Sequence, residues 1–111
     1  MSDARLPAHL EVAALIRMAE TAGGFAVVAH RGERDAGTIL LLTTERGQNP
    51  RLWERMPNLA GTRRFSPLAP SSNGESAIAD YLSRRCARDA DLWVVELDVA
   101  TPERFIAELG T

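Results

Sequence analysis

The sequence contains no lysine: all 13 of its basic side chains other than histidine are arginines. Without an amine, the chain cannot form a Walker A phosphate loop, a pyridoxal Schiff base or a lysine general base. Cysteine and histidine are also scarce, with one cysteine (Cys86) and two histidines (His9 and His30). These counts exclude a disulfide within the chain and a zinc site with four Cys or His ligands.

Long apolar runs and a large excess of one charge are missing as well. The longest clear apolar run, residues 39–42, is far shorter than the roughly 20 residues of a membrane-spanning helix. Residues 1–5 contain no cationic segment that leads into an apolar run, and a single cysteine suits a reducing compartment. We therefore expect a cytoplasmic location and no membrane partner. The net charge of −2 argues against bulk affinity for nucleic acid.

The pattern of apolar residues predicts one α+β domain over residues 1–111. Helical spacing and capping signals predict helices over residues 7–22, from the capping box at 72–75 to about residue 86, and over residues 101–109. Runs rich in β-forming residues predict strands at 25–31, 38–44, 51–56, 62–66 and 92–98. The predicted order is α-β-β-β-β-α-β-α. We expect a mostly antiparallel five-stranded sheet with the helices packed on one face.

Turn signals predict how these strands are connected. A polar segment bounded by glycines, residues 32–37, separates the first two predicted strands and indicates a hairpin. The second of them is apolar on both faces, which predicts a central position in the sheet. Residues 57–61 indicate another hairpin, and residues 67–74 have the composition of a loop.

The arginines are unevenly distributed along the chain. Residues 46–64 contain five arginines and one acid, Glu54, which gives a local charge of +4 and leaves −6 for the remainder. A hairpin with Met56 opposite Thr62 would place Arg55 opposite Arg63, Glu54 opposite Arg64 and Trp53 opposite Phe65. Strand alternation then predicts one face that carries the following residues: Arg51, Trp53, Arg55, Arg63 and Phe65.

Two interpretations of this predicted face are open. Arginines beside exposed aromatic rings can bind phosphate or carboxylate groups while a ring stacks on the ligand. In the alternative, Trp53 and Phe65 belong to the core, and the arginines lie at its edge and pair with acids elsewhere. We favour the core interpretation, because large aromatic residues in a chain with few of them are usually core anchors. A ligand site on this face requires an exposed Trp53.

Glu96 and Asp98 form a second candidate site. They share one face of a predicted strand, about 7 Å apart, which suits a metal or an acid–base pair, and His30 closes another strand. The alternative is structural, with the acids paired to arginines or facing water, and Glu96 is the better candidate for a buried ion pair. No Ser-His-Asp order or glycine-rich nucleotide motif is present.

The second predicted helix carries a cysteine and a run of arginines. Cys86 lies on its apolar side and is interpreted as a small core residue. Arg84, Arg85 and Arg88 are expected to form a solvated face that Asp89 and Asp91 could tie to the following strand.

Several stretches together resemble a family of small bacterial proteins, domain-of-unknown-function family number 1491. The most specific stretch is residues 84–96, Arg-Arg-Cys-Ala-Arg-Asp-Ala-Asp-Leu-Trp-Val-Val-Glu. The other stretches are residues 31–32, 36–37, 52–55 and 63–65. The resemblance covers nearly the whole chain and implies a single domain. It implies no activity, because the family has none that could be carried over.

These observations favour a small cytoplasmic, non-enzymatic module that binds a protein or an anionic small molecule and needs no cofactor. Its predicted contact surface is the arginine-bearing hairpin with an exposed sheet edge, which could also support a homodimer. The alternative from another class is a metal-dependent hydrolase that uses Glu96, Asp98 and His30. A third interpretation is a nucleic-acid-associated protein, whose affinity would fall steeply with salt.

Overall fold

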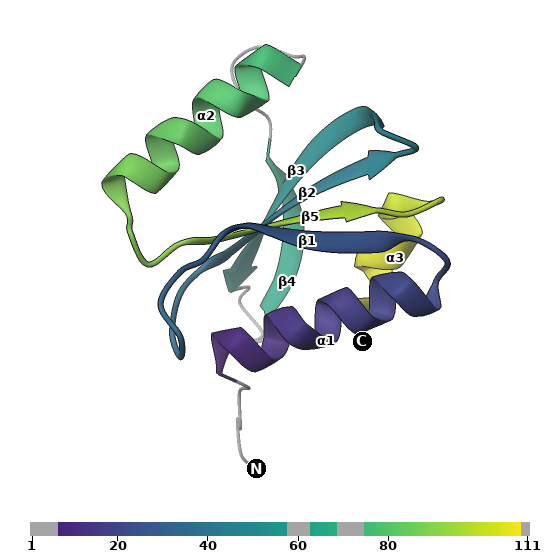
Figure 1. Ribbon diagram of the computed structural model, residues 1–111, viewed down its shortest axis with the longest axis horizontal. Helices are drawn as coiled ribbons and strands as arrows, with labels where there is room; N and C mark the ends of the chain where they lie inside the picture. The colour runs from purple at the N-terminus through teal and green to yellow at the C-terminus, as the bar shows by residue number, and fades with distance from the viewer. Residues whose placement is uncertain (1–6, 58–62, 69–74, 110–111) are drawn as a thin grey trace.

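A computed structural model describes residues 7–57, 63–68 and 75–109 of the chain. Three helices and five strands occur in the predicted order (Figure 1). Their bounds are α1 (Ala8–Thr21), β1 (Phe25–His30), β2 (Ile39–Glu45), β3 (Gln48–Pro57), β4 (Arg63–Leu68), α2 (Glu75–Arg88), β5 (Trp93–Asp98) and α3 (Pro102–Leu109). The α+β class and the order of elements are thus confirmed. No helix in the described part of the chain is long and apolar enough to cross a membrane.

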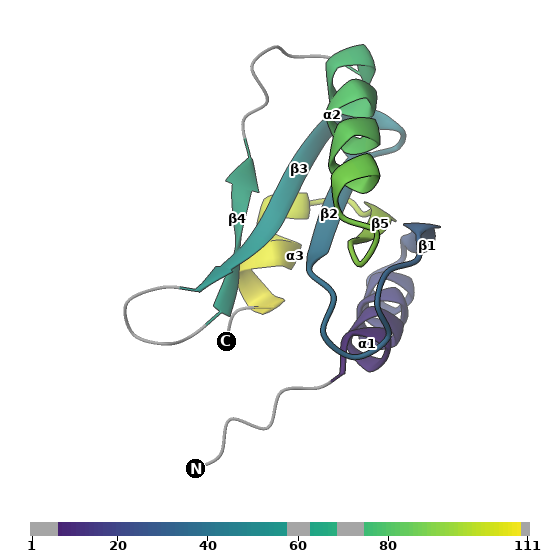
Figure 2. The same ribbon diagram turned by 90° about the vertical axis from the view of Figure 1, so that its left-hand side faces the viewer.

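The five strands form one sheet in the order β1-β5-β2-β3-β4. Figure 2 shows β4 at one edge and β1 at the other. All neighbouring strands are antiparallel except β2 and β5, which are parallel. The prediction that β1 and β2 form a hairpin is wrong, because β5 lies between them in the sheet.

The composition of β5 explains its place between β1 and β2. Val95 and Leu97 on one face and Val94 on the other are all almost fully buried. A strand that is apolar on both faces is stable only where other strands flank it and both faces are covered. Local turn signals could not reveal that β5 separates β1 from β2, because β5 lies far along the chain from the segment that connects them.

The helices cover both faces of the sheet, so the expectation that they pack on one face is wrong. α1 and α3 share a core with residues such as Leu41, Trp53 and Val95. On the opposite face, Leu40 and Val94 form a smaller cluster with side chains of α2. Figure 1 shows α2 above the sheet and α1 below it. The physical reason is that the central strands present apolar side chains on both faces, and each face must be removed from water.

The β3–β4 hairpin differs from its predicted register by two residues. Arg55 lies opposite Phe65 and Trp53 opposite Pro67, rather than opposite Arg63 and Phe65. β3 continues to Pro57 and β4 to Leu68, so the strands are longer than predicted. A shift of two leaves every side chain on its predicted face, because strand side chains alternate with a period of two.

Candidate functional site

Trp53, the aromatic residue at the centre of the predicted binding face, belongs to the core. Its side chain is only 5% exposed and packs in the cluster that α1 and α3 cover. Its indole N–H donates a hydrogen bond to the hydroxyl of Thr43 at 2.9 Å, so the polar end of the ring is satisfied inside the protein. The core interpretation of Trp53 is therefore confirmed, and the exposure that a stacking site requires is not observed.

The arginines of the same face are engaged within the protein. The Arg51 guanidinium lies 4.6 Å from the centre of the Trp53 ring and pairs with Glu103 of α3. The Arg55 guanidinium lies 4.7 Å from the ring of Phe65 and pairs with a carboxylate of α1. Phe65 itself is partly buried against the core.

Arg63 of β4 lies opposite Pro57 of β3. The structure describes the backbone of Arg63 and not its side chain. A ligand role for this face remains a prediction, in which an anion would compete with Glu103 and Glu11 for the guanidinium groups of β3.

Arg85 connects α2 to the sheet. Its guanidinium donates to both carboxylate oxygens of Glu54 on β3, at 3.1 and 3.3 Å, and to the Tyr81 hydroxyl at 2.7 Å. The hydrogen bonds that Arg85 donates to the Glu54 carboxylate raise the pKa of Arg85 above its ordinary value. Arg84 and Arg88 are exposed as predicted, whereas Arg85 is not part of a solvated face.

Cys86, next to this ion pair, is partly buried and packs against the smaller cluster beneath α2. This packing agrees with its interpretation as a small core residue.

Asp98 is a structural carboxylate at the end of β5. It accepts hydrogen bonds from the Thr44 hydroxyl at 2.6 Å and from the backbone N–H groups of Arg46 and Gly47 at 3.1 and 2.8 Å. The Thr44 hydroxyl, followed by these two amides, lowers the pKa of Asp98. All three donors belong to β2 or to the turn that follows it, so Asp98 joins the end of β5 to this turn.

Glu96 and His30 do not join Asp98 in a metal site. His30 uses its Nδ1 to contact the carbonyl oxygen of Leu92 at 2.7 Å, which is the expected structural role. Within residues 7–57, 63–68 and 75–109, no three His, Cys, Asp or Glu side chains are grouped closely enough to hold a metal ion. Glu96 is exposed, so the predicted buried ion pair at Glu96 is wrong.

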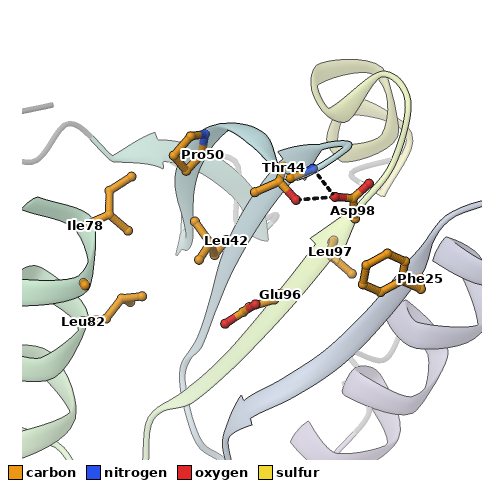
Figure 3. A pocket seen from close by; sticks show the side chains of 11 residues that line it. Phe25, Leu42, Thr44, Pro50, Ile78, Leu82, Glu96, Leu97 and Asp98 are labelled. Atoms are coloured by element: carbon orange, nitrogen blue, oxygen red, sulfur yellow. Dashed lines mark hydrogen bonds between the residues drawn. The ribbon is translucent and has the colours of Figure 1, made fainter. Parts of the chain in front are cut away.

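A hollow of about 490 Å³ lies between α2 and the sheet (Figure 3). Its size falls within the range of small ligand sites, and such sites are usually apolar with a few polar groups. Its polar side chains among the described residues are Thr44, Glu96 and Asp98, and none of the described arginines lines it. Its apolar side chains are Phe25, Leu42, Pro50, Ile78, Ala79, Leu82 and Leu97.

The edge strand β1 borders this hollow and carries three large apolar side chains that are exposed. Phe25, Val27 and Val28 are 58%, 49% and 40% exposed. Phe25 lies opposite Asp98 and Val27 opposite Glu96 on β5. Residues directly opposite one another share a face of the sheet, so Phe25 and Val27 face the same side as the hollow.

Sequence reasoning predicted an exposed sheet edge as part of the contact surface but did not identify β1 as that edge, although one signal was available. The strand Phe-Ala-Val-Val-Ala-His has neither a formally charged residue at neutral pH nor a proline. That composition fits an internal strand as well as an edge, and the β1–β2 hairpin prediction concealed which of the two applies.

Comparison with known proteins identifies relatives over most of the chain. A family model described as "Protein of unknown function (DUF1491)" matches residues 6–107. The crystal structure of a DUF1491 family protein from Caulobacter crescentus is 33% identical and has a TM-score of 0.80, covering 91% of this chain and 94% of that one. The solution structure of protein Atu0922 from A. tumefaciens is 32% identical with a TM-score of 0.75, covering 92% of both chains. No curated protein is significantly similar to the chain.

Proposed function

On the premise that the chain belongs to the DUF1491 family, whose function is unknown, we propose that it is a protein-interaction module. It binds an extended polypeptide segment along the edge strand β1. The observation that carries this proposal is the exposure of Phe25 and Val27 on a strand without charge or proline. A cytoplasmic location is part of the proposal and rests on composition.

The contrast between the two edges of the sheet supports β1, rather than β4, as the binding edge. Natural sheets protect their edges with charged residues, proline, bulges or short strands, because unpaired N–H and C=O groups attract other strands. β4 carries two arginines and Pro67 within six residues. β1 has none of these residues, and its only irregularity is a shift of register between Val28 and His30. The β1 edge is therefore suited to pair with another strand.

Strand addition would use backbone hydrogen bonds for affinity and side-chain contacts for specificity. An added segment would pair with the free side of β1, since β5 occupies the other side. Its side chains on the hollow side would cover Phe25 and Val27 and remove their apolar surface from water. Burial of such side chains contributes about 25 cal/mol per Å² of apolar surface.

Site-specific crosslinking tests the proposal. A photoreactive phenylalanine analogue replaces Phe25 in the cell, and a control protein carries it at Leu10, which is exposed on α1. We expect a crosslinked partner from position 25 that position 10 does not capture.

The captured partner is then purified and titrated against the wild-type protein, Val27→Lys and Leu10→Lys. Val27→Lys should weaken binding at least tenfold, whereas Leu10→Lys should leave binding unchanged. Equal crosslinking from both positions, or equal affinity of Val27→Lys and wild type, would reject the proposal.

A further inference from the structure

We infer that the segment bound at β1 carries a cationic side chain, arginine or lysine, that reaches across Val27 to Glu96 at the hollow between α2 and the sheet. This inference rests on the proposed function and specifies the chemistry of the partner. It follows from the charges at the hollow and from the register of β1 and β5.

The hollow has an unmatched negative charge. Among the residues that the structure describes, its carboxylates are those of Glu96 and Asp98, and no arginine lines it. Asp98 already accepts three hydrogen bonds from the β2–β3 turn. Glu96 is exposed and has no ion pair with any residue in the described part of the chain. A ligand with a positive charge is the complement of this surface.

The sheet geometry places Glu96 within reach of an added strand. Val27 lies directly opposite Glu96, and a residue of the added strand opposite Val27 would occupy the same face. Two strand spacings then separate its backbone from that of Glu96, about 10 Å in total. The side chains of an arginine or lysine and of Glu96 together span this distance.

The surroundings suit the aliphatic part of such a side chain. Its methylene groups would lie over Val27 and beside Phe25, while its charged end reaches Glu96; long basic side chains commonly cover apolar surface in this way. Two positions along the added strand, the next side chain on this face would lie beside Phe25. The predicted partner segment is thus extended, with a basic residue at one position and an apolar residue two positions away.

Matched peptides test this inference. The probes are the peptide Thr-Val-Thr-Arg-Thr-Val-Thr, with both terminal charges removed, and two otherwise identical peptides with glutamine or glutamate in place of arginine. Each is titrated to millimolar concentration into isotope-labelled wild-type protein, Glu96→Gln and Glu20→Gln, and backbone amide shifts are followed by NMR. Glu20 is an exposed carboxylate on α1 and provides the matched control.

We expect all bound peptides to shift amides of β1. The arginine peptide should bind wild type about two- to fivefold more tightly than the glutamine peptide, a preference typical of an exposed ion pair, and the glutamate peptide should bind most weakly. Glu96→Gln should abolish the preference, and Glu20→Gln should retain it.

The opposite results separate the two proposals. Equal binding of the three peptides at β1, or an arginine preference that survives Glu96→Gln, would overturn the inference that a basic side chain reaches Glu96. Either result would remain compatible with strand addition at β1. If no peptide shifts the β1 amides, strand addition itself fails. A free protein that sediments as a dimer, and as a monomer after Val27→Lys, would also overturn the inference, because β1 of a second copy carries no arginine or lysine.

Discussion

The carboxylate of Asp98 accepts a hydrogen bond from the backbone N–H of Gly47 at 2.8 Å. Asp98 ends β5, whereas Gly47 lies in the turn between β2 and β3, so the contact joins segments that are far apart in the chain. The same carboxylate accepts the Thr44 hydroxyl and the N–H of Arg46. One side chain therefore fixes the turn to the end of an internal strand of the sheet.

Replacing Asp98 by asparagine should destabilise the fold at neutral pH. The substitution removes the charge that strengthens three hydrogen bonds and places an amide NH₂ where an acceptor is needed. We expect a loss of about 1–3 kcal/mol in the free energy of unfolding, measured by urea denaturation. Glu96→Gln, two residues earlier on the same strand face, is the control and should change stability by less than about 0.5 kcal/mol.

The contribution of Asp98 should also depend on pH. Its hydrogen bonds lower the pKa in the folded state, so the unfolded chain binds this proton more tightly than the folded chain. The stabilisation is complete well above the unfolded value of about 3.9 and is lost as pH falls through the lowered folded pKa. The stability difference between wild type and Asp98→Asn should shrink over this acidic range. A difference that stays constant there would contradict the assignment.

The turn held by Asp98 contains an arginine in a left-handed conformation. Arg46 has φ of 55° and Gly47 has φ of 77°, the signs that a type I′ hairpin turn requires. Asn-Gly is the preferred pair for this turn, and most other residues with a side chain are strained in it. Arg46→Asn should therefore raise the melting temperature, with a gain of about 0.5–1 kcal/mol. Arg46→Val, which is β-branched, should lower it, and the opposite order would disprove the turn assignment.

Arg85 and Glu54 should be energetically coupled. Both side chains are largely buried between α2 and β3, and removal of one partner leaves the other charged and unpaired. Arg85→Met and Glu54→Gln should each cost about 2–4 kcal/mol. The double variant should cost less than the two single costs combined, with a coupling of about 1–2 kcal/mol. Urea denaturation of the four proteins measures the cycle, and additive costs would show that the pair contributes nothing.

The sequence predicts element order and strand faces well because both follow from local spacing. The shared face of Arg55 and Phe65 is correct although the register is shifted, since a shift of two preserves alternation. The exact register depends on how far β3 and β4 extend, and this is decided by packing of residues such as Leu52 and Leu68, which lie opposite each other. No local pattern encodes that extension.

Strand neighbours and the candidate binding surface could not be predicted in the same way. β1 and β2 are not neighbours because β5 lies between them, where the apolar residues on both faces of β5 are buried. Once β5 is inserted, Phe25 and Val27 lie on an edge. Their exposure is a property of the complete sheet, and the same residues in an internal strand would have been buried.

Gly37 should not tolerate a side chain. A Cβ atom at this position would lie 2.2 Å from the carbonyl oxygen of Asp91 and 2.8 Å from the ring of Trp93. The oxygen belongs to the backbone just before β5 and cannot move without disturbing its pairing. Gly37→Ala should cost about 1–3 kcal/mol. Ala36→Ser, at the exposed neighbouring position, should be nearly neutral, and equal melting temperatures for the two variants would contradict the close approach.

Thr43 should be required because it satisfies the indole of Trp53. The Thr43 side chain is fully buried and accepts the indole N–H at 2.9 Å. Thr43→Val keeps the shape but leaves the N–H unpaired, which should cost about 1–3 kcal/mol. In a Trp53→Phe background no N–H remains, so the same substitution should cost less than about 1 kcal/mol. Urea denaturation followed by circular dichroism measures both costs, and equal values would show that the hydrogen bond does not stabilise the core.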